Sequence, residues 1–342
     1  SVFLAIAVVA SLSSSSAVAA TKKPTTKPAA KSSAKPAAKP AAKEKAAENS
    51  AAKPKNQARS VVSADWLAQN LSDPKVKIIE VSTEQGLYER GHIQNAVNFA
   101  WHTDFVDPVN RDIISQEKFT ALAQKAGINK DSTVVLYGDK NNWFAAWGAW
   151  IFNIYGQSDV RILDGGRVKW EKDARAFTTA VPTLKAGSFK ATKVDRSLRA
   201  NLVGDVLPVA KGIKKNVKLV DIRSADEYSG KIFAPAGFQE LAVRAGHIPG
   251  AENIAWGLNV NSDGTFKTVA ELKKLYADKG IDGSKAIITY CRIGERSSLT
   301  WFVLSEILGY NDVKNYDGSW TEYGNSVGAP ISNPAGTIWG SF

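Results

Sequence analysis

The sequence predicts an α/β protein of two tandem domains, each with a doubly wound, mainly parallel sheet and helices on both faces. The chain has 342 residues, enough for about two domains at roughly 150 residues each. Short apolar runs alternate with helix-like patterns, as they do in parallel α/β sheets. A third observation, an internal duplication, indicates that this unit occurs twice.

Four pairs of segments carry the duplication. The second copy of each pair resembles the first in residue type and order, and the pairs are 76–81 with 217–222, 89–101 with 244–256, 133–137 with 286–290, and 159–165 with 312–318. The spacing between the copies runs from 141 to 155 residues, and the difference reflects an insertion in the second copy near residues 231–243. A repeat this long indicates tandem domains and not a solenoid.

The second copy shows the order of its elements most clearly. Residues 219–221 and 286–290 are largely apolar runs, typical of strands buried on both faces. Residues 269–276 have helical spacing and precede a stop at Gly280, and 297–308 read as a helix that ends at Gly309. Sites in such sheets form at the carboxyl ends of strands, so we expect chemistry just after residue 290.

The N-terminal residues predict export followed by a flexible spacer. Residues 1–20 carry no charge, and Ala17-Val18-Ala19 has the small-x-small form of a signal-peptidase site, so we interpret 1–20 as an export signal truncated at its start. An apolar tail is the alternative. The protein is then expected to be periplasmic or extracellular. Residues 21–59 are rich in Lys, Ala and Pro, which predicts a disordered linker.

Charge separates the linker from the rest of the chain. Residues 21–59 hold ten Lys and Arg59 against Glu44 and Glu48, so they carry most of the formal net charge of +11. The linker either contacts an anionic envelope surface or is a solvated spacer. The remaining chain is nearly neutral and has no basic-aromatic surface motif, so we predict no nucleic-acid partner.

The predicted boundaries follow from the repeat and the linker. They place a first domain at 60–180, an interdomain linker at 181–205, a second domain at 206–330 and a C-terminal tail at 331–342. One cysteine excludes an intramolecular disulfide and a zinc site built on several cysteines. Three histidines disfavour a multi-histidine centre. We therefore predict no metal and no other cofactor.

Cys291 is the candidate nucleophile. It ends the run 286–290 and precedes a short loop with Arg292, Ile293, Gly294, Glu295, Arg296 and Ser297. Backbone N–H groups of 292–297 are expected to surround the sulfur, with Gly294 allowing the tight turn. Such surroundings lower a thiol pKa to roughly 3.5–7.5, so we expect a thiolate.

These motifs together resemble the rhodanese family over residues 60–330. The resemblance rests on Asp221-Ile222-Arg223, the turn 246–251, the loop 291–296 and Asp317-Gly318-Ser319-Trp320. It implies two rhodanese-like domains, as in two-domain thiosulfate and 3-mercaptopyruvate sulfurtransferases, with a catalytic second domain. The first copy has Gly138 in place of the cysteine, which implies a catalytically silent domain.

The resemblance implies transfer of sulfane sulfur from thiosulfate to cyanide or a thiol through a Cys291 persulfide. Alternatives are 3-mercaptopyruvate as the donor, or a non-catalytic persulfide carrier or envelope-binding protein. Cysteine phosphatases enclose five residues between cysteine and arginine, whereas Cys291 and Arg296 enclose four, which favours sulfur. Arg292 favours thiosulfate, because small residues at this position are typical of the mercaptopyruvate branch.

Several residues are expected to support the loop. Arg292 is expected to face the donor and Arg296 to brace the loop or add charge, with a salt bridge to Asp221 or Glu295 as the alternative for both. The resemblance implies that Asp221 organises the loop. Glu227 and Ile293 replace an arginine and a lysine of animal enzymes, so Arg223 and Arg244 are possible substitutes. His247 is expected to be structural and not a general base, because the silent copy has His92.

Overall fold

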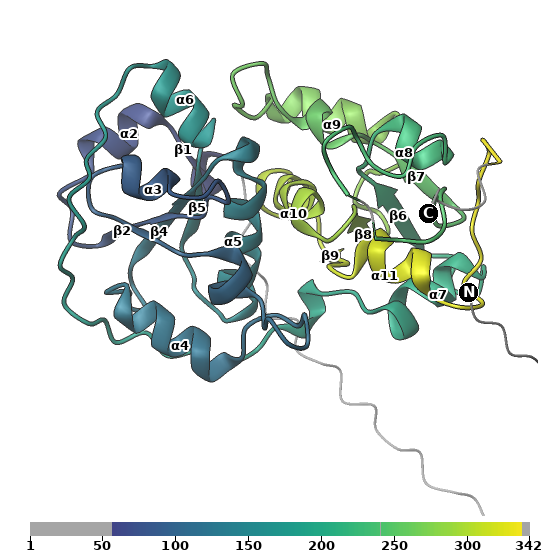
Figure 1. Ribbon diagram of the computed structural model, residues 1–342, viewed down its shortest axis with the longest axis horizontal. Helices are drawn as coiled ribbons and strands as arrows, with labels where there is room; N and C mark the ends of the chain where they lie inside the picture. Colours follow the sequence, from purple (N-terminus) through teal and green to yellow (C-terminus); the bar gives the residue numbers. More distant parts are fainter. Residues whose placement is uncertain (1–56, 240, 337–342) are drawn as a thin grey trace, which may run out of the picture. The chain divides into compact units, whose positions relative to one another are not determined.

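The computed structural model describes residues 57–239 and 241–336 (Figure 1). The predicted export signal and linker residues 21–56 lie outside the described residues. The linker prediction is wrong at its end, because helix α1 (Gln57–Ser60) precedes the first strand. Ser60 Oγ donates a hydrogen bond to the Glu306 carbonyl (3.1 Å). This contact with a distant part of the chain gives the segment an ordered position.

The first domain contains a five-stranded sheet in the order β1-β5-β4-β2-β3, with every pair parallel. Its elements in chain order are β1 (Val61–Val62), α2 (Ala64–Gln69), β2 (Val76–Glu80), α3 (Leu87–Arg90), β3 (Ala96–Asn98), α4 (Gln116–Lys125), β4 (Thr133–Tyr137), α5 (Trp143–Ile154), β5 (Val160–Leu163) and α6 (Gly166–Lys172).

The second domain contains a four-stranded, wholly parallel sheet in the order β7-β6-β8-β9. Its elements are α7 (Leu207–Ala210), β6 (Val217–Asp221), α8 (Ala225–Ser229), β7 (Ala251–Asn253), α9 (Val269–Ala277), β8 (Ala286–Tyr290), α10 (Glu295–Phe302), β9 (Val313–Asn315) and α11 (Ser319–Asn325). The predicted helix 297–308 starts earlier, at Glu295, and continues as a π turn over Val303–Ile307.

Alternating burial along the strands creates two layers of core. Val135 and Tyr137 of β4 belong to a cluster with α2 and α6, whereas Val134 and Leu136 belong to a cluster with α4 and α5. Successive side chains of a strand point to opposite faces, so each face needs its own helices. Figure 1 shows helices on both sides of this sheet. The two domains thus have the predicted doubly wound architecture.

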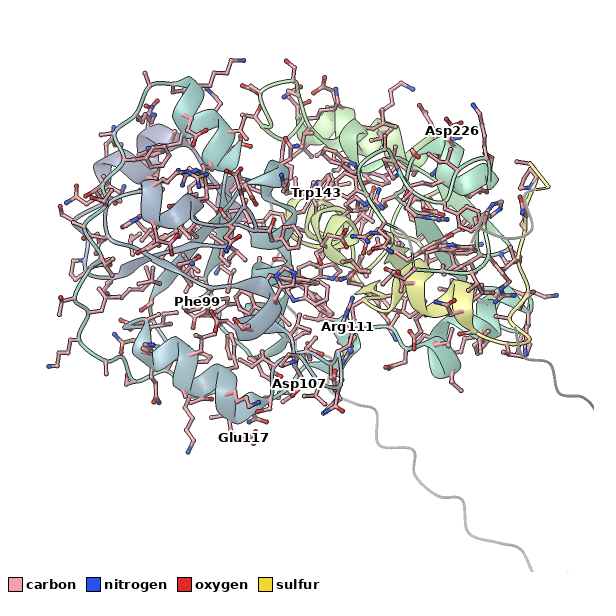
Figure 2. All side chains as sticks on the ribbon, viewed as in Figure 1. Phe99, Asp107, Arg111, Glu117, Trp143 and Asp226 are labelled. Carbon is pink, nitrogen blue, oxygen red and sulfur yellow. The ribbon has the colours of Figure 1, made fainter. Side chains whose placement is uncertain are left out.

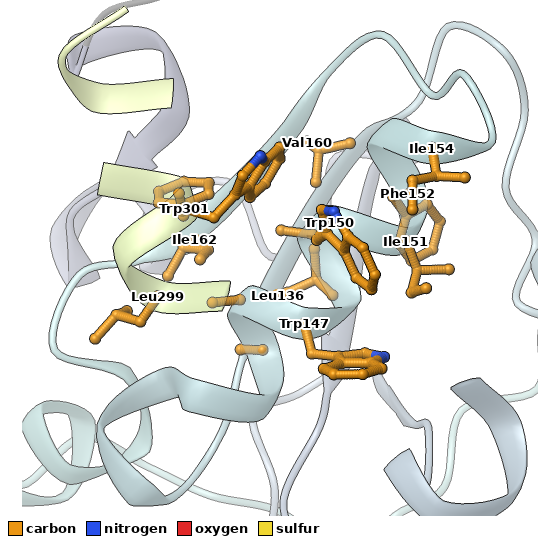
Figure 3. Close-up of a cluster of buried hydrophobic side chains, with 14 of the residues drawn as sticks. Leu136, Trp147, Trp150, Ile151, Phe152, Ile154, Val160, Ile162, Leu299 and Trp301 are labelled. Carbon is orange, nitrogen blue, oxygen red and sulfur yellow. The ribbon is translucent and has the colours of Figure 1, made fainter. Parts of the chain in front are cut away.

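Helix α5 joins the cores of the two domains. Trp147 and Trp150 are fully buried and lie in one cluster with Leu299 and Trp301 of the second domain (Figure 3). A helix that is apolar on most of its surface is buried on most of its surface. The packing role predicted for its tryptophans is therefore confirmed. The first domain forms part of the wall around the helix that follows Cys291.

Two segments outside the regular elements also belong to the second domain. Arg199, inside the predicted interdomain linker, forms a parallel bridge with Asn315 beside β9. Ser332, inside the predicted tail, pairs with His247. Within the described ranges, none of the helices is both long and apolar enough to cross a bilayer.

Candidate active site

Strand β8 delivers Cys291 to the carboxyl edge of the second sheet, where the sequence predicts chemistry. The backbone N–H of Gly294 donates to the Cys291 sulfur (3.1 Å). Gly294 has a φ of 99° and caps α10, which begins at the next residue. A Cβ there would lie 2.7 Å from the Asp317 Cα and 2.7 Å from Trp147 Cζ3. Only glycine therefore fits the turn that aims this N–H at the sulfur.

The Cys291 thiol is fully buried and lies 3.3 Å from Glu295 Oε2. Burial raises the pKa of Cys291, and the Glu295 carboxylate raises it further, outweighing the opposite effect of Arg296 and Ser297. The prediction of a lowered thiol pKa is therefore wrong for this arrangement. The loop does supply an N–H and a nearby cation, but desolvation and a carboxylate favour the neutral thiol.

Arg296 braces the loop, as expected, but its main partner was not anticipated. Its two terminal nitrogens lie 3.2 and 3.1 Å from the Glu227 carboxylate, while its Nε lies 3.8 Å from Glu295. Burial alone would raise the pKa of Glu227, but the bond to Arg296 holds that pKa below its usual value. Glu227 lies on α8, the helix that follows β6, so this ion pair connects α10 to α8.

Arg292 points to the insertion that distinguishes the second copy. Its Nη1 donates to the Gln239 carbonyl (2.7 Å). The alternative of a salt bridge to Asp221 or Glu295 is not what the structure shows. A carbonyl carries no full negative charge, and no carboxylate among residues 57–239 and 241–336 forms an ion pair with Arg292.

Asp221 and Arg223 pair with each other and not with the loop. Arg223 Nη2 lies 2.6 Å from the Asp221 carboxylate and also donates to the Gly246 carbonyl (2.7 Å). The guanidinium lies 4.6 Å from the Trp320 ring centre, and both charged side chains are buried. Neither side chain bonds residues 292–297, so the loop-organising role of Asp221 and the donor contact of Arg223 stay predictions that these contacts do not support.

The first domain repeats this arrangement without a cysteine. Glu80 ends the equivalent strand and pairs with Arg167 (2.9 Å), and it also accepts a hydrogen bond from Tyr137. In both copies the tyrosine hydroxyl in turn accepts a backbone N–H, from Ile93 in the first and from Ile248 in the second. A network present in a domain without the nucleophile serves the fold and not the chemistry.

Arg244 and His247 are also structural. Arg244 donates to the carbonyls of Tyr323, Gly324, Ser326 and Ala329 around the end of α11, so its expected donor contact is wrong. His247 stacks on Tyr228 and its Nδ1 lies 2.8 Å from the Tyr228 carbonyl. His92 stacks on Tyr88 in the same way. These contacts agree with a structural role for His247, which stays a prediction.

Comparison with known proteins agrees with this geometry. The family described as "Rhodanese-like domain" matches residues 63–173 and again residues 208–326. The chain belongs to the rhodanese family. The second match contains Cys291 and its loop, and the first contains the equivalent loop at Gly138. The chain is therefore a tandem rhodanese, in agreement with the two parallel sheets.

Three relatives indicate the chemistry of the family. A Mycolicibacterium smegmatis protein named "Putative thiosulfate sulfurtransferase" is 52% identical over 272 residues, 79% of this chain and 96% of the relative. The Thermus thermophilus "Sulfur carrier protein TtuD" is 50% identical over 80% of this chain and 96% of the relative. The structure of the 3-mercaptopyruvate sulfotransferase SseA from Escherichia coli is similar, with a TM-score of 0.65 and 28% identity, covering 76% of this chain and 98% of SseA.

In this member of the rhodanese family, the loop at Gly138 differs from the loop at Cys291 in shape as well as in sequence. A Cβ at Gly138 would lie 2.2 Å from the Val81 carbonyl oxygen. Asn142 fills the loop, since its Oδ1 accepts the Gly138 N–H (3.0 Å) and its Nδ2 donates to the Leu163 carbonyl (2.8 Å). The first copy therefore has no room for the missing thiol.

Two rhodanese residues at the loop were not predicted. Ser319 Oγ accepts the Cys291 N–H (3.0 Å), although the sequence predicts no role for Ser319 within the motif 317–320. Arg111 comes from the first domain (labelled in Figure 2) and donates to the Ile293 carbonyl (2.7 Å). The duplication could have pointed to Ser319, but no local pattern marks Arg111, because its partner is far away in the chain.

A cavity of about 760 Å³ lies beside Ile293. Its charged lining is balanced: Arg199 bonds both oxygens of Asp317 at 2.8 Å and also bonds Asp112. Cys291 does not line it. In the described part of the chain, no three His, Cys, Asp or Glu side chains are grouped to hold a metal ion.

Proposed function

We propose that this sulfurtransferase moves the outer sulfur of thiosulfate through a Cys291 persulfide to a thiol or to cyanide. The Cys291 sulfur would attack the outer sulfur of thiosulfate. The S–S bond of the donor breaks and its electron pair leaves with sulfite. An acceptor thiolate or cyanide then attacks the outer sulfur of the persulfide and releases Cys291.

One observation carries the proposal: the chain's single cysteine ends β8 with a backbone N–H aimed at its sulfur and α10 beginning directly behind the loop. An N–H at a helix start stabilises the negative charge that develops on sulfur. Relatives of about 50% identical sequence carry the name "Putative thiosulfate sulfurtransferase". Arg292, adjacent to the nucleophile, donates to the Gln239 carbonyl and has no carboxylate partner among the described residues, which supports an anionic donor.

A persulfide carrier is the second candidate. The Thermus thermophilus relative is named a sulfur carrier protein, and the fully buried thiol of Cys291 would protect a persulfide from small molecules until a partner opens the site. In this alternative the persulfide forms but turns over only with a protein acceptor. The SseA likeness supports 3-mercaptopyruvate as a second donor to be tested.

Intact-protein mass spectrometry tests the proposal directly. Exposure to thiosulfate should add the mass of one sulfur atom, exposure to 3-mercaptopyruvate should add less, and Cys291→Ser should gain nothing. The variant has no thiol, so it is a complete control. Thiocyanate formation from thiosulfate and cyanide then separates the enzyme, which turns over, from the carrier, which stays loaded. A wild-type protein that gains no sulfur from either donor would refute both.

We also propose that the protein is exported and that its basic linker contacts an anionic envelope surface. This rests on the uncharged residues 1–20 and on the Lys-rich residues 21–59. Cell fractionation with N-terminal sequencing tests it, and the mature chain should begin after Ala19 or nearby. A full-length protein in the cytoplasmic fraction would contradict export. Unchanged envelope binding after deletion of the linker would contradict the contact.

A further inference from the structure

We infer that Glu295 is the proton acceptor of the Cys291 thiol: it takes the proton when the donor arrives and returns it when the persulfide is discharged. The inference rests on the proposed function, because it assigns a second catalytic residue to the same sulfur transfer. Glu295 would act on the reacting atom itself.

The geometry places one proton between two buried groups. Glu295 Oε2 lies 3.3 Å from the Cys291 sulfur, and the two residues are 3% and 0% exposed. The Gly294 N–H reaches the same sulfur from another side (3.1 Å). In this arrangement the thiol is the donor and the carboxylate the acceptor. Once the proton has moved, the N–H remains as a donor to the thiolate.

Other charges around the pair are already engaged. Arg296 gives most of its bonding to Glu227 of α8, with its Nε 3.8 Å from Glu295 Oε1. Three further charged groups near the loop have other partners: Arg111 binds the Ile293 carbonyl, Asp317 binds Arg199, and Arg292 binds the Gln239 carbonyl. The structure therefore offers no second acid or base in contact with the Cys291 sulfur among the residues it describes.

The arriving donor supplies the driving force for proton transfer. Attack on the outer sulfur of thiosulfate consumes the thiolate as it forms, and this draws the thiol proton toward the Glu295 carboxylate. Moving the proton from sulfur to Oε2 neutralises that carboxylate and creates the thiolate that attacks. The pair keeps one proton and one negative charge throughout, so no charge has to enter or leave the buried loop before the donor binds.

The same proton serves the second half of the cycle. After sulfite leaves, the persulfide anion lies beside a neutral carboxylic acid, which donates a hydrogen bond to it. When an acceptor thiolate removes the outer sulfur, Cys291 leaves as a thiolate and recovers the proton from Glu295. The S–S bond of the persulfide breaks, a new S–S bond forms on the acceptor, and the starting pair is restored.

Glu295→Gln tests the inference, because glutamine keeps the shape but cannot accept a proton. Persulfide formation is measured in single turnover, by quenching and intact mass, from about pH 5.5 to 9.5, a range that spans an ordinary thiol pKa. The wild-type rate should vary little with pH. The variant should be slower by about 10²-fold near pH 7, in line with a lost general base, and should accelerate as pH rises.

A control and an independent readout separate the possible results. Glu322→Gln removes an exposed acid from the first turn of α11 and should leave the profile unchanged. Alkylation of Cys291 by iodoacetamide needs no sulfur transfer and should show the same contrast between wild type and Glu295→Gln. If the wild type gains no sulfur while the alkylation contrast holds, only the proposed function fails.

An equal or faster reaction of Glu295→Gln at neutral pH would overturn the inference, since the carboxylate would then act only by repelling the thiolate. If that variant does not fold, infrared difference spectra of the wild type decide. A protonated-carboxyl band should appear on loading with thiosulfate and be missing in Cys291→Ser. Loading without such a band would overturn the inference as well.

Discussion

Gly294→Ala should damage the loop and the stability of the domain together. Two separate penalties add at this position. The positive φ of 99° costs a residue with a Cβ about 1–2 kcal/mol. The new Cβ would meet the Asp317 Cα and Trp147 Cζ3 at 2.7 Å each, and overpacking of this kind costs about 1–3 kcal/mol. We therefore expect a loss of about 2–5 kcal/mol in the free energy of unfolding.

Urea unfolding measures this loss, and two glycines of the same chain provide matched controls. Gly250 has a φ of 80° but nothing within 4 Å of its Cβ position, so Gly250→Ala reports the backbone penalty alone. Gly204 has open space and no positive φ, so Gly204→Ala should change stability by at most about 0.5 kcal/mol. A Gly294→Ala variant no less stable than Gly250→Ala would refute the tight contact with Trp147 and Asp317.

Three further predictions follow from the same contacts. Glu227→Gln leaves the buried Arg296 without its carboxylate and should lower the free energy of unfolding by about 3–5 kcal/mol. In the wild type this ion pair lowers the pKa of Glu227, so its stabilisation is complete above the ordinary value of 4.5 and is lost as pH falls through the lowered pKa. Equal acid sensitivity of the wild type and the variant in urea titrations would argue against this prediction. The pKa of Cys291 in the resting protein should lie above the ordinary value of 9.0. Thiolate absorbance measures it, with Cys291→Ser as the blank. A thiolate already present at pH 7 would contradict the buried thiol–carboxylate pair. Gly138→Cys should destabilise the first domain and gain no sulfur from thiosulfate, because its Cβ would collide with the Val81 carbonyl. A second persulfide in the intact mass would refute this prediction, since the loop at residue 138 would then accommodate a reactive thiol.

The duplication explains why so much of the fold could be predicted. Apolar runs such as 286–290 are local signals, and the repeat provides the same signal again at 133–137. Comparison of the copies also separated structure from chemistry. His92 and His247 each stack on a tyrosine, and Glu80 and Asp221 each pair with an arginine, so these contacts form in both domains and do not require the thiol.

The partners of the arginines could not be predicted from the sequence. Arg223 and Arg244 are predicted as possible substitutes at the donor site, and Arg296 as a brace of the loop or a source of charge. Their partners are Asp221, the carbonyls near the end of α11, and Glu227. A guanidinium can pair with any carboxylate or carbonyl within reach of a long side chain, and which one it meets depends on packing between elements.

The order of residues in this chain was sufficient to predict two parallel α/β domains, the position of the single thiol after a strand, and the glycine of its turn, because those features depend on neighbours in sequence. Only the tertiary structure decided the protonation state of the thiol, the partner of each arginine and the bond from Arg111 of the first domain to Ile293. Burial and charge pairing act through space, and Glu295 and the closed surroundings of Cys291 outweigh the loop amides only once the domains have packed.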